Sequence, residues 1–537
     1  MPRLAPAVVL EDVRVPAADG ARLATDVVRV DDGRRRPVLL IRGPYLRAAV
    51  RASVDLAGMA REGWVVVNQD TRGRGDSEGS AEPFVSEAAD GAAAVAWCAR
   101  QPWSDGRVAM WGGSYLGFTQ WAAASRRPRA LRAIAPLAAP SDLLRDWHYD
   151  GGAFCAGIAT GWSALMASTD TSLSKRDRAR IAKLAGEWER LYDGPPAENL
   201  LAELYPPYRR LLDASDRRFW GTLDLTRRFR HMDVAAYQMA GWYDLFCEGA
   251  FRSWQALREE APSEYARASQ RLVVGPWSHT GMLSRATPEL DFGPHAAGSW
   301  AESFTWLRDA VDGKPVAGGL RVFVMGRNDW EELEDWPPRG RTVALYPTST
   351  AGARSLRGDG VLDTRPGEAG ADRFLHDPAN PVPTRGGRIL GPWLPVAGPS
   401  DQRPVEERGD LLVYTSAALA EDVTIMGTVT GTALFETNAR SADVTMKLVD
   451  VHPDGRAFNV LDSVVRAPFT PGRAKSVEVT LGSIAQTFLR GHRIRLEVAS
   501  SNFPRFDLNP PAAAQQTLHH GKRTGTRIVL PVVDGEL

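Results

Sequence analysis

The chain has 537 residues, which is too long for one hydrophobic core and predicts about two to four domains. Its 65 basic residues balance 65 acidic ones, so the net charge is zero and gives no indication of a nucleic-acid partner or an anionic membrane surface. No apolar run reaches the roughly 18 residues of a membrane span. Composition therefore argues against nucleic-acid and membrane partners, and it leaves open whether the chain forms a homo-oligomer.

The N-terminus and the cysteines favour a cytoplasmic protein. Glu11 and Asp12 come too early for the apolar core of a signal peptide. The three cysteines, Cys98, Cys155 and Cys247, are widely separated and form neither a CxxC pair nor a disulfide framework, which is typical of buried thiols in a reducing compartment. No HExxH motif or Cys/His cluster indicates a metal, and we expect no cofactor.

The first part of the chain alternates strands with helices, which predicts a parallel sheet covered on both faces. It begins with an expected hairpin that turns at Asp19-Gly20. A helix is expected over 85–101, and the expected strands are 37–42, 64–69, 107–111, 131–136, 234–240 and 270–274.

Two other regions break this rhythm. Residues 142–232 are helical and charged, and about 90 residues are too many for one crossover, so we expect an inserted cap. From about residue 316, short alternating strands recur between Gly, Pro and Asp turns, beginning with 320–325, and they predict an all-β sandwich of jelly-roll type. The expected parts are therefore 1–141 and 233–315 for the sheet, 142–232 for the cap and 316–537 for the sandwich.

Residues 107–125 predict a sharp turn between a strand and a helix that presents a serine. An apolar run ends in Gly112-Gly113-Ser114, and a helix-compatible segment follows. Such a turn exposes the hydroxyl at the end of a sheet and leaves the next backbone N–H, that of Tyr115, free to donate. The following glycine comes at 117, one place later than in Gly-x-Ser-x-Gly, so an ordinary Gly-Ser turn remains an alternative.

A serine needs a base and an orienting acid, and the chain offers both in a suitable order. Asp244 and His279 each lie in a short loop directly after an apolar strand, where catalytic loops of such sheets lie. The rival acids Asp224 and Asp233 precede their strand instead of following it. Glu248 falls where a helix should have begun, which favours a supporting or surface position.

A second oxyanion donor should come from a loop early in the sheet. Tyr45 lies in such a loop, directly after the strand 37–42, and a phenolic O–H can stabilise an oxyanion. A packed loop aromatic is the equal alternative. The glycine-rich segment 68–79 matches neither a dinucleotide nor a Walker pattern, and we interpret it as a structural loop.

These pieces together resemble the cocaine-esterase-like serine hydrolases, which are grouped with the X-Pro dipeptidyl-peptidase and α-amino-acid ester hydrolase families. The resemblance extends over most of the chain and rests on Arg42-Gly-Pro-Tyr45, Gln69–Gly79, Gly112–Gly117, Gly241-Trp-Tyr-Asp244, Gly275-Pro-Trp-Ser-His279, Val322–Asn328 and Trp336-Pro-Pro338.

The resemblance implies an α/β-hydrolase fold with an inserted helical cap and a C-terminal jelly roll. It implies Ser114 as nucleophile, Asp244 as acid and His279 as base, with Tyr45 and the Tyr115 amide as oxyanion donors. Members of the family bind an acyl group between cap and jelly roll. For that pocket the resemblance indicates Phe246, and more weakly Trp147 and Trp162.

We therefore expect a serine hydrolase that cleaves a small-molecule carboxylic ester through an acyl-enzyme. An X-Pro dipeptidyl aminopeptidase, an amide acylase or α-amino-acid ester hydrolase, and an acyltransferase could use the same triad. No acidic cluster for a substrate ammonium can be placed in the sequence, which favours a plain ester. A binding protein with a decayed site is the least favoured alternative.

Overall fold

The computed structural model describes residues 7–391, 396–521 and 525–537. Its first part is built on a sheet with the strand order β1-β2-β4-β3-β5-β6-β9-β10-β11-β12. The strands from β4 to β11 in this order run parallel, and antiparallel strands close both edges. The strands are β1 (Val8–Pro16), β2 (Arg22–Val30), β3 (Arg36–Gly43), β4 (Val65–Asp70), β5 (Ser104–Gly113), β6 (Leu131–Leu137), β9 (Ala235–Tyr243), β10 (Gln270–Ser278), β11 (Gly319–Val324) and β12 (Asp329–Leu333).

Helices cover both faces of this sheet because its central strands are apolar on both sides. On β3, Val38 and Leu40 pack with α3 and α4, whereas Leu39 and Ile41 pack with α2 and α13. This arrangement confirms the α/β fold class that the sequence predicts. The helices of this part are α1 (Arg47–Ser53), α2 (Leu56–Arg61), α3 (Glu87–Ala99), α4 (Tyr115–Ala124), α11 (Cys247–Glu260), α12 (Glu264–Ala268), η4 (Pro294–Ala296) and α13 (Trp300–Val311).

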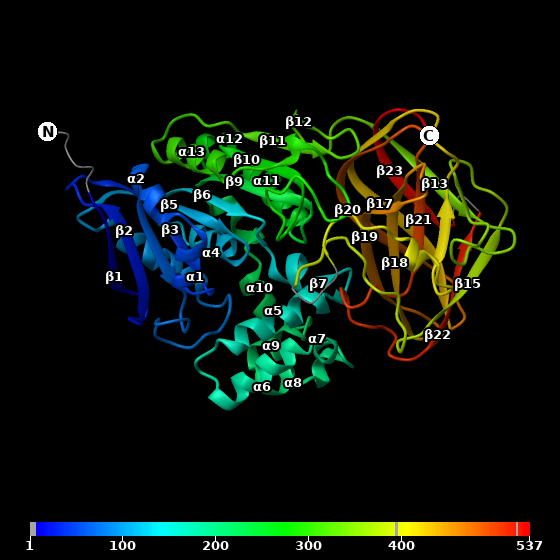
Figure 1. The fold of residues 1–537 in the computed structure, drawn as a ribbon, viewed down its shortest axis with the longest axis horizontal. Helices are drawn as coiled ribbons and strands as arrows, with labels where there is room; N and C mark the ends of the chain where they lie inside the picture. The colour runs from blue at the N-terminus through cyan, green and yellow to red at the C-terminus, as the bar shows by residue number, and fades with distance from the viewer. Residues whose placement is uncertain (1–6, 392–395, 522–524) are drawn as a thin grey trace.

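A helical segment is inserted between β6 and β9 and lies below the sheet in Figure 1. It begins with a π-helix and a short hairpin, and its apolar side chains join the same core cluster as α3 and α4. We call it the cap. Its elements are η1 (Leu144–His148), β7 (Tyr149–Asp150), β8 (Ala153–Phe154), α5 (Ala156–Ser168), α6 (Lys175–Gly186), α7 (Trp188–Leu191), η2 (Pro196–Glu198), α8 (Leu200–Leu204), α9 (Pro206–Leu211), α10 (Arg217–Leu223) and η3 (Thr226–His231).

The C-terminal part is a β-sandwich, at the right of Figure 1. Its strands follow the order β15-β22-β17-β23-β13-β14-β16-β21-β18-β19, and β20 pairs with β17. The elements are β13 (Arg341–Thr348), β14 (Val361–Asp363), β15 (Gly370–His376), α14 (Arg403–Glu406), β16 (Leu412–Thr415), β17 (Val423–Thr437), β18 (Ser441–Val451), β19 (Ala457–Pro468), β20 (Lys475–Phe488), β21 (Arg493–Ala499), β22 (Ala514–His520) and β23 (Arg527–Asp534).

The position of β11 differs from the sequence prediction, which gave residues 320–325 to the sandwich. In the structure β11 pairs in parallel with β10, with Leu272 opposite Leu320, and β12 folds back on it. A short strand with alternating apolar residues has the same sequence pattern whether it joins the parallel sheet or the sandwich. Its assignment here depends on the edge of β10, which is open for a further parallel strand. Met325, directly after β11, exchanges backbone hydrogen bonds with Ala485 and Thr487 of β20 and so links the two parts.

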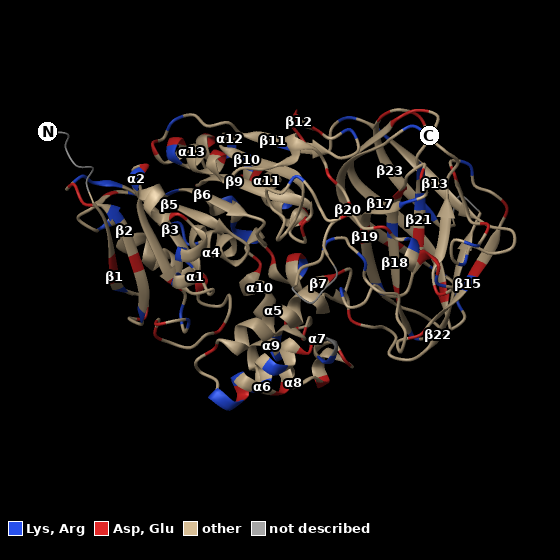
Figure 2. Ribbon diagram, viewed as in Figure 1, with Lys and Arg blue, Asp and Glu red and all other residues tan. Residues whose placement is uncertain are grey.

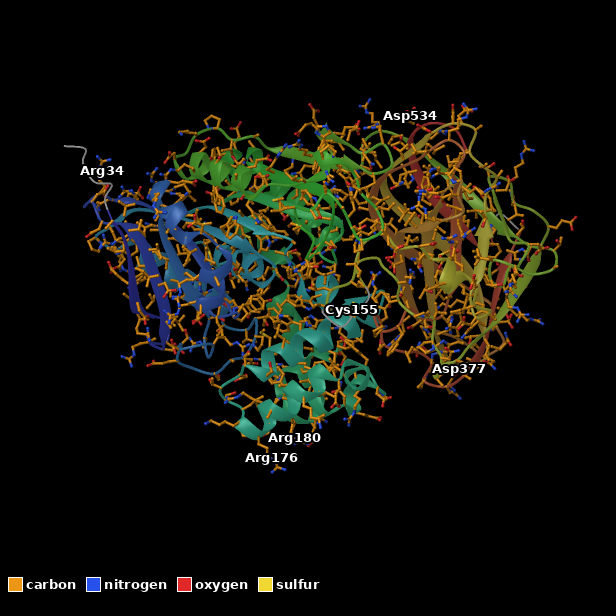
Figure 3. The ribbon with its side chains drawn as sticks, in the orientation of Figure 1. Arg34, Cys155, Arg176, Arg180, Asp377 and Asp534 are labelled. Carbon is orange, nitrogen blue, oxygen red and sulfur yellow. The ribbon has the colours of Figure 1, made fainter. Side chains whose placement is uncertain are left out.

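The three parts meet along a seam that is both apolar and charged. One apolar cluster runs from β10, β11 and α11 into the sandwich strands. Cys155 of the cap, labelled in Figure 3, packs with Val464 and Phe506 of the sandwich. Figure 2 shows acidic and basic residues interspersed over all three parts. Among the described residues, no helix is long and apolar enough to cross a membrane.

Candidate active site

Ser114 lies in a strained turn between β5 and α4. Its backbone has φ 59° and ψ −126°, a region that side-chain-bearing residues rarely adopt. The turn is held because the Ser114 N–H donates to Leu137 O at 2.9 Å, and because Ser114 O accepts from the N–H groups of Gly117 and Phe118. Strain that the surroundings enforce is typical of functional positions.

The late glycine of the turn has a packing reason. A Cβ at Gly117 would lie 2.3 Å from the Ala139 Cβ, so only glycine fits there. Position 116 can hold leucine because the Leu116 side chain covers Gly43 and Gly112, where an added Cβ would come within 2.5 Å and 2.7 Å of it. The departure from Gly-x-Ser-x-Gly is therefore accommodated by Gly43 at the end of β3, whose missing side chain leaves room for Leu116.

Asp244 and His279 come together through strand register. Strands β9 and β10 run parallel with Tyr243 opposite Ser278, so the next residues of both strands, Asp244 and His279, are neighbours. Their side chains meet at 2.6 Å, from His279 Nδ1 to Asp244 Oδ2. Asp244 is fully buried, and its other oxygen accepts the Phe246 N–H at 2.6 Å. This carboxylate is therefore fixed to orient the imidazole.

These loops share one edge of the sheet with Ser114. Strands β5, β6, β9 and β10 are consecutive in the sheet and parallel, so all their carboxyl ends lie on the same side. Ser114 follows β5, Asp244 follows β9 and His279 follows β10. The rival acids lie elsewhere: Asp224 bonds Thr226 and Arg227, and Asp233 bonds Ser263.

Tyr45 reaches the same edge from the loop after β3. Its hydroxyl accepts a hydrogen bond from Trp162 Nε1 at 3.1 Å and interacts with the Ser114 side chain. Burial raises the pKa of Tyr45, and the bonds with Trp162 and Ser114 only partly oppose this effect. The phenol therefore keeps its proton and can act as a hydrogen-bond donor.

Only the backbone of Tyr115 faces the site. It is the first residue of α4, so its N–H has no carbonyl partner within the helix. Its phenol is buried and turned away, donating to Glu87 Oε1 at 2.9 Å and accepting the Phe84 N–H at 2.8 Å. Glu87 is paired in turn with the buried Arg42 at 3.1 Å. The sequence analysis did not find this supporting network, because in the sequence Glu87 is typical of an acidic residue in the first turn of a helix.

A row of aromatic rings connects the Tyr45 side of the site with the His279 side. Trp162, which bonds Tyr45, lies 5.0 Å from Trp147, Trp147 lies 5.3 Å from Phe246, and Phe246 lies 5.3 Å from His279 (ring centroids). The structure thus brings together the three residues that the sequence indicates for the acyl pocket. The buried Trp147 Nε1 has no hydrogen-bond partner in the described part of the chain.

A cavity of about 260 Å³ lies beside this row, between cap and sandwich. Trp147 and Leu245 line its side toward the triad, and Leu481 lines the sandwich side. Its charged lining is balanced, with four arginines and four acids: Arg145, Arg252, Arg388, Arg505, Asp146, Asp150, Glu248 and Asp462.

Comparison with known proteins matches this architecture part by part. The family model of the X-Pro dipeptidyl-peptidase (S15 family) matches residues 19–281, and that of the X-Pro dipeptidyl-peptidase C-terminal non-catalytic domain matches residues 317–531. A cocaine esterase of Rhodococcus sp. (strain MB1 Bresler) is 35% identical over 98% of both chains. The chain belongs to the X-Pro dipeptidyl-peptidase (S15) family.

Solved structures show the same fold for this S15 family protein. An aminopeptidase from a marine sediment Thaumarchaeota archaeon aligns with a TM-score of 0.79 at 22% identity, over 99% of this chain and 98% of that one. An α-amino acid ester hydrolase aligns with a TM-score of 0.78 at 23% identity, with the same coverage. The family match and the 35% identity to a cocaine esterase identify this S15 family protein as a serine hydrolase, and that relative supports the narrower class of ester hydrolases.

Proposed function

We propose that the protein hydrolyses a small, uncharged carboxylic ester through an acyl-enzyme formed on Ser114. The observation that carries this proposal is the 2.6 Å bond between His279 Nδ1 and a fully buried Asp244, on the sheet edge where the strained turn presents Ser114. An imidazole held in this way has Nε2 free as the base for a serine hydroxyl.

The reaction would proceed in two halves. His279 Nε2 takes the Ser114 proton as Oγ attacks the ester carbonyl, and the proton then passes to the departing alcohol as the acyl–oxygen bond breaks. Water attacks the acyl-enzyme by the same route and releases the acid. During both halves, the carbonyl oxygen carries negative charge, and the Tyr45 hydroxyl and the Tyr115 N–H would stabilise it.

The pocket supports an uncharged substrate with a flat apolar group. The row of Trp162, Trp147 and Phe246 places three buried apolar rings next to the triad, and Trp147 lines the cavity. Glu248, which follows Asp244 by four residues and lines the cavity, is already satisfied: Arg388 and the Ser483 N–H donate to Oε1, and the Ser483 hydroxyl donates to Oε2. It is therefore poorly suited to bind a substrate ammonium, which favours a plain ester over an amino-acyl substrate.

Replacing the nucleophile tests the proposal. Ser114→Ala should lower kcat for a p-nitrophenyl ester by at least about 10⁴-fold, because the remaining groups cannot form the acyl-enzyme. Circular dichroism should be unchanged, and a fluorophosphonate probe should label the wild type and not the variant. A variant that keeps more than about a tenth of the wild-type rate would disprove the assignment. An unlabelled, inactive wild type would revive the binding-protein alternative.

The same assay separates the alternatives that share the triad. The wild type would be offered a neutral ester, an Xaa-Pro amide and an α-amino ester, each with and without an added amine acceptor. We expect kcat/KM to be highest for the neutral ester and unaffected by the amine. A higher value for the amide would indicate a peptidase, and transfer of the acyl group to the amine would indicate an acyltransferase.

The cytoplasmic location stays a prediction from the sequence.

A further inference from the structure

Two histidines and an aspartate meet at one end of the sandwich, in the part of the chain that the ester chemistry does not use. Strands β18 and β21 are antiparallel neighbours, with Asp450 opposite Ile494 and Val451 opposite Arg493. The same register continued by one residue places His452, directly after β18, opposite His492, directly before β21. The two imidazole centroids are 4.4 Å apart.

The Asp450 carboxylate reaches both rings, one with each oxygen. Oδ1 is 2.8 Å from His492 Nδ1, whereas Oδ2 is 3.8 Å from His452 Nε2 and accepts from Gln486 Nε2 at 3.4 Å. A separation of 3.8 Å is too long for a hydrogen bond. Within the described residues, neither ring nitrogen of His452 has a hydrogen-bond partner, although this side chain is only 21% exposed. The His452 ring nitrogens therefore remain available to a further ligand.

We propose that Asp450, His452 and His492 bind a divalent transition-metal ion, with Zn²⁺ as the best fit and water as a fourth ligand. One ligand atom from each residue lies within 4.8 Å of the other two. Two ligands of a tetrahedral zinc ion are roughly 3.4 Å apart, given Zn–N and Zn–O bonds of about 2.1 Å. The 3.8 Å between His452 and Asp450 is thus a few tenths of an ångström from ligand spacing.

The donor set fits this ion. Two imidazoles with one carboxylate suit zinc and its neighbours better than calcium or magnesium, which take oxygen ligands.

The ion would have a structural role. It would tie the hairpin between β18 and β19 to the start of β21, next to Gln486 on β20. The residues on either side of Gln486, Ala485 and Thr487, form the hydrogen bonds with Met325 that link the sandwich to the first sheet. A metal here would stabilise the edge of the sandwich that meets β11.

Zinc titration of the full chain tests this site. After EDTA treatment and buffer exchange, ZnCl₂ would be added to the wild type, His452→Gln and His231→Gln in a calorimeter, with CoCl₂ absorption as a probe of tetrahedral ligation. His231 is an exposed histidine of the cap and serves as the matched control. We expect one tight zinc equivalent and a raised Tm in the wild type and His231→Gln. In His452→Gln, the affinity should fall at least about tenfold, with unchanged ester turnover.

Two results would overturn the proposal. One is equal zinc affinity in the wild type and His452→Gln, which would move the binding elsewhere, for example to His279. The other is no zinc binding by a folded, active wild type, which would leave a purely hydrogen-bonded cluster. Asp450→Asn could disturb folding, so the conclusion rests on His452→Gln. His452 lies at the end of the hairpin between β18 and β19, where a substitution disturbs fewer packing contacts.

Discussion

Two neighbouring tyrosines of the site are used in opposite ways. The Tyr45 phenol points to Ser114, whereas Tyr115 contributes only its backbone and buries its phenol against Glu87. The sequence predicted the Tyr45 side chain and the Tyr115 amide as the two oxyanion donors, but it did not indicate that the Tyr115 phenol would be buried against Glu87. The structure therefore predicts different consequences for the same chemical change at the two positions.

Removing each hydroxyl tests this difference. Tyr45→Phe should lower kcat by about 10²–10³-fold with little change in KM, because one oxyanion donor is lost. Tyr115→Phe should keep kcat within about tenfold, because its N–H remains, but it should lower Tm, since Glu87 and the Phe84 N–H lose a buried partner. Steady-state kinetics and thermal melts on both variants give the answer. A large kcat loss in Tyr115→Phe alone would reverse the two roles.

At the scale of elements, the turn around Ser114 depends on close packing of α4 against the segment after β6. Gly117→Ala would place two Cβ atoms 2.3 Å apart, and overpacking of this kind costs about 1–3 kcal/mol. We expect the variant to lose Tm and activity together. The double variant Gly117→Ala/Ala139→Gly removes the opposing Cβ and should recover most of both losses. If it recovers neither, the contact with Ala139 does not explain the glycine.

The register between neighbouring strands explains which features of the structure could be predicted from the sequence and which could not. Asp244 and His279 were predictable because each directly follows an apolar strand, and neighbouring parallel strands deliver such residues to one edge. The position of β11 was not predictable, because its alternating pattern fits both the parallel sheet and the sandwich. The His452–His492 pair was missed for a related reason: no Cys/His spacing in the sequence signals it, and only the antiparallel register of β18 and β21 brings the two together.

At the scale of the whole molecule, the pocket depends on how the cap, the sheet and the sandwich dock. Arg388 of the sandwich part is the central contact: it donates to Trp242 O, next to the triad segment, as well as to Glu248 and Ser483 O. Burial alone would raise the pKa of Glu248. The attraction of Arg388 and the hydrogen bonds from Ser483 outweigh this effect and lower the pKa, so Glu248 and Arg388 both stay charged. The cavity at this seam is lined by cap and sandwich residues that lie outside the triad motifs, so those motifs alone left ester and amide chemistry open.

The sandwich also contains a carboxylate pair that makes its stability depend on pH. Glu406 of α14 is fully buried beside Glu497, and Arg495 donates to its Oε2 at 2.6 Å. Burial and the charge of Glu497 raise the pKa of Glu406 from 4.5 to about 8. The folded protein therefore holds this proton more tightly than the unfolded chain does. The resulting stability is complete below about pH 4.5 and is lost as pH rises to about 8.

Glu406→Gln should remove this dependence. The amide is neutral at every pH, can still accept from Arg495 and can donate to Glu497. We expect the variant to have a higher free energy of unfolding than the wild type at about pH 9, and a smaller difference at about pH 6. Urea denaturation of the full chain at both pH values measures this effect, with the exposed neighbour variant Glu407→Gln as control. A variant destabilised equally at both pH values would mean that Glu406 is already ionised in the folded protein.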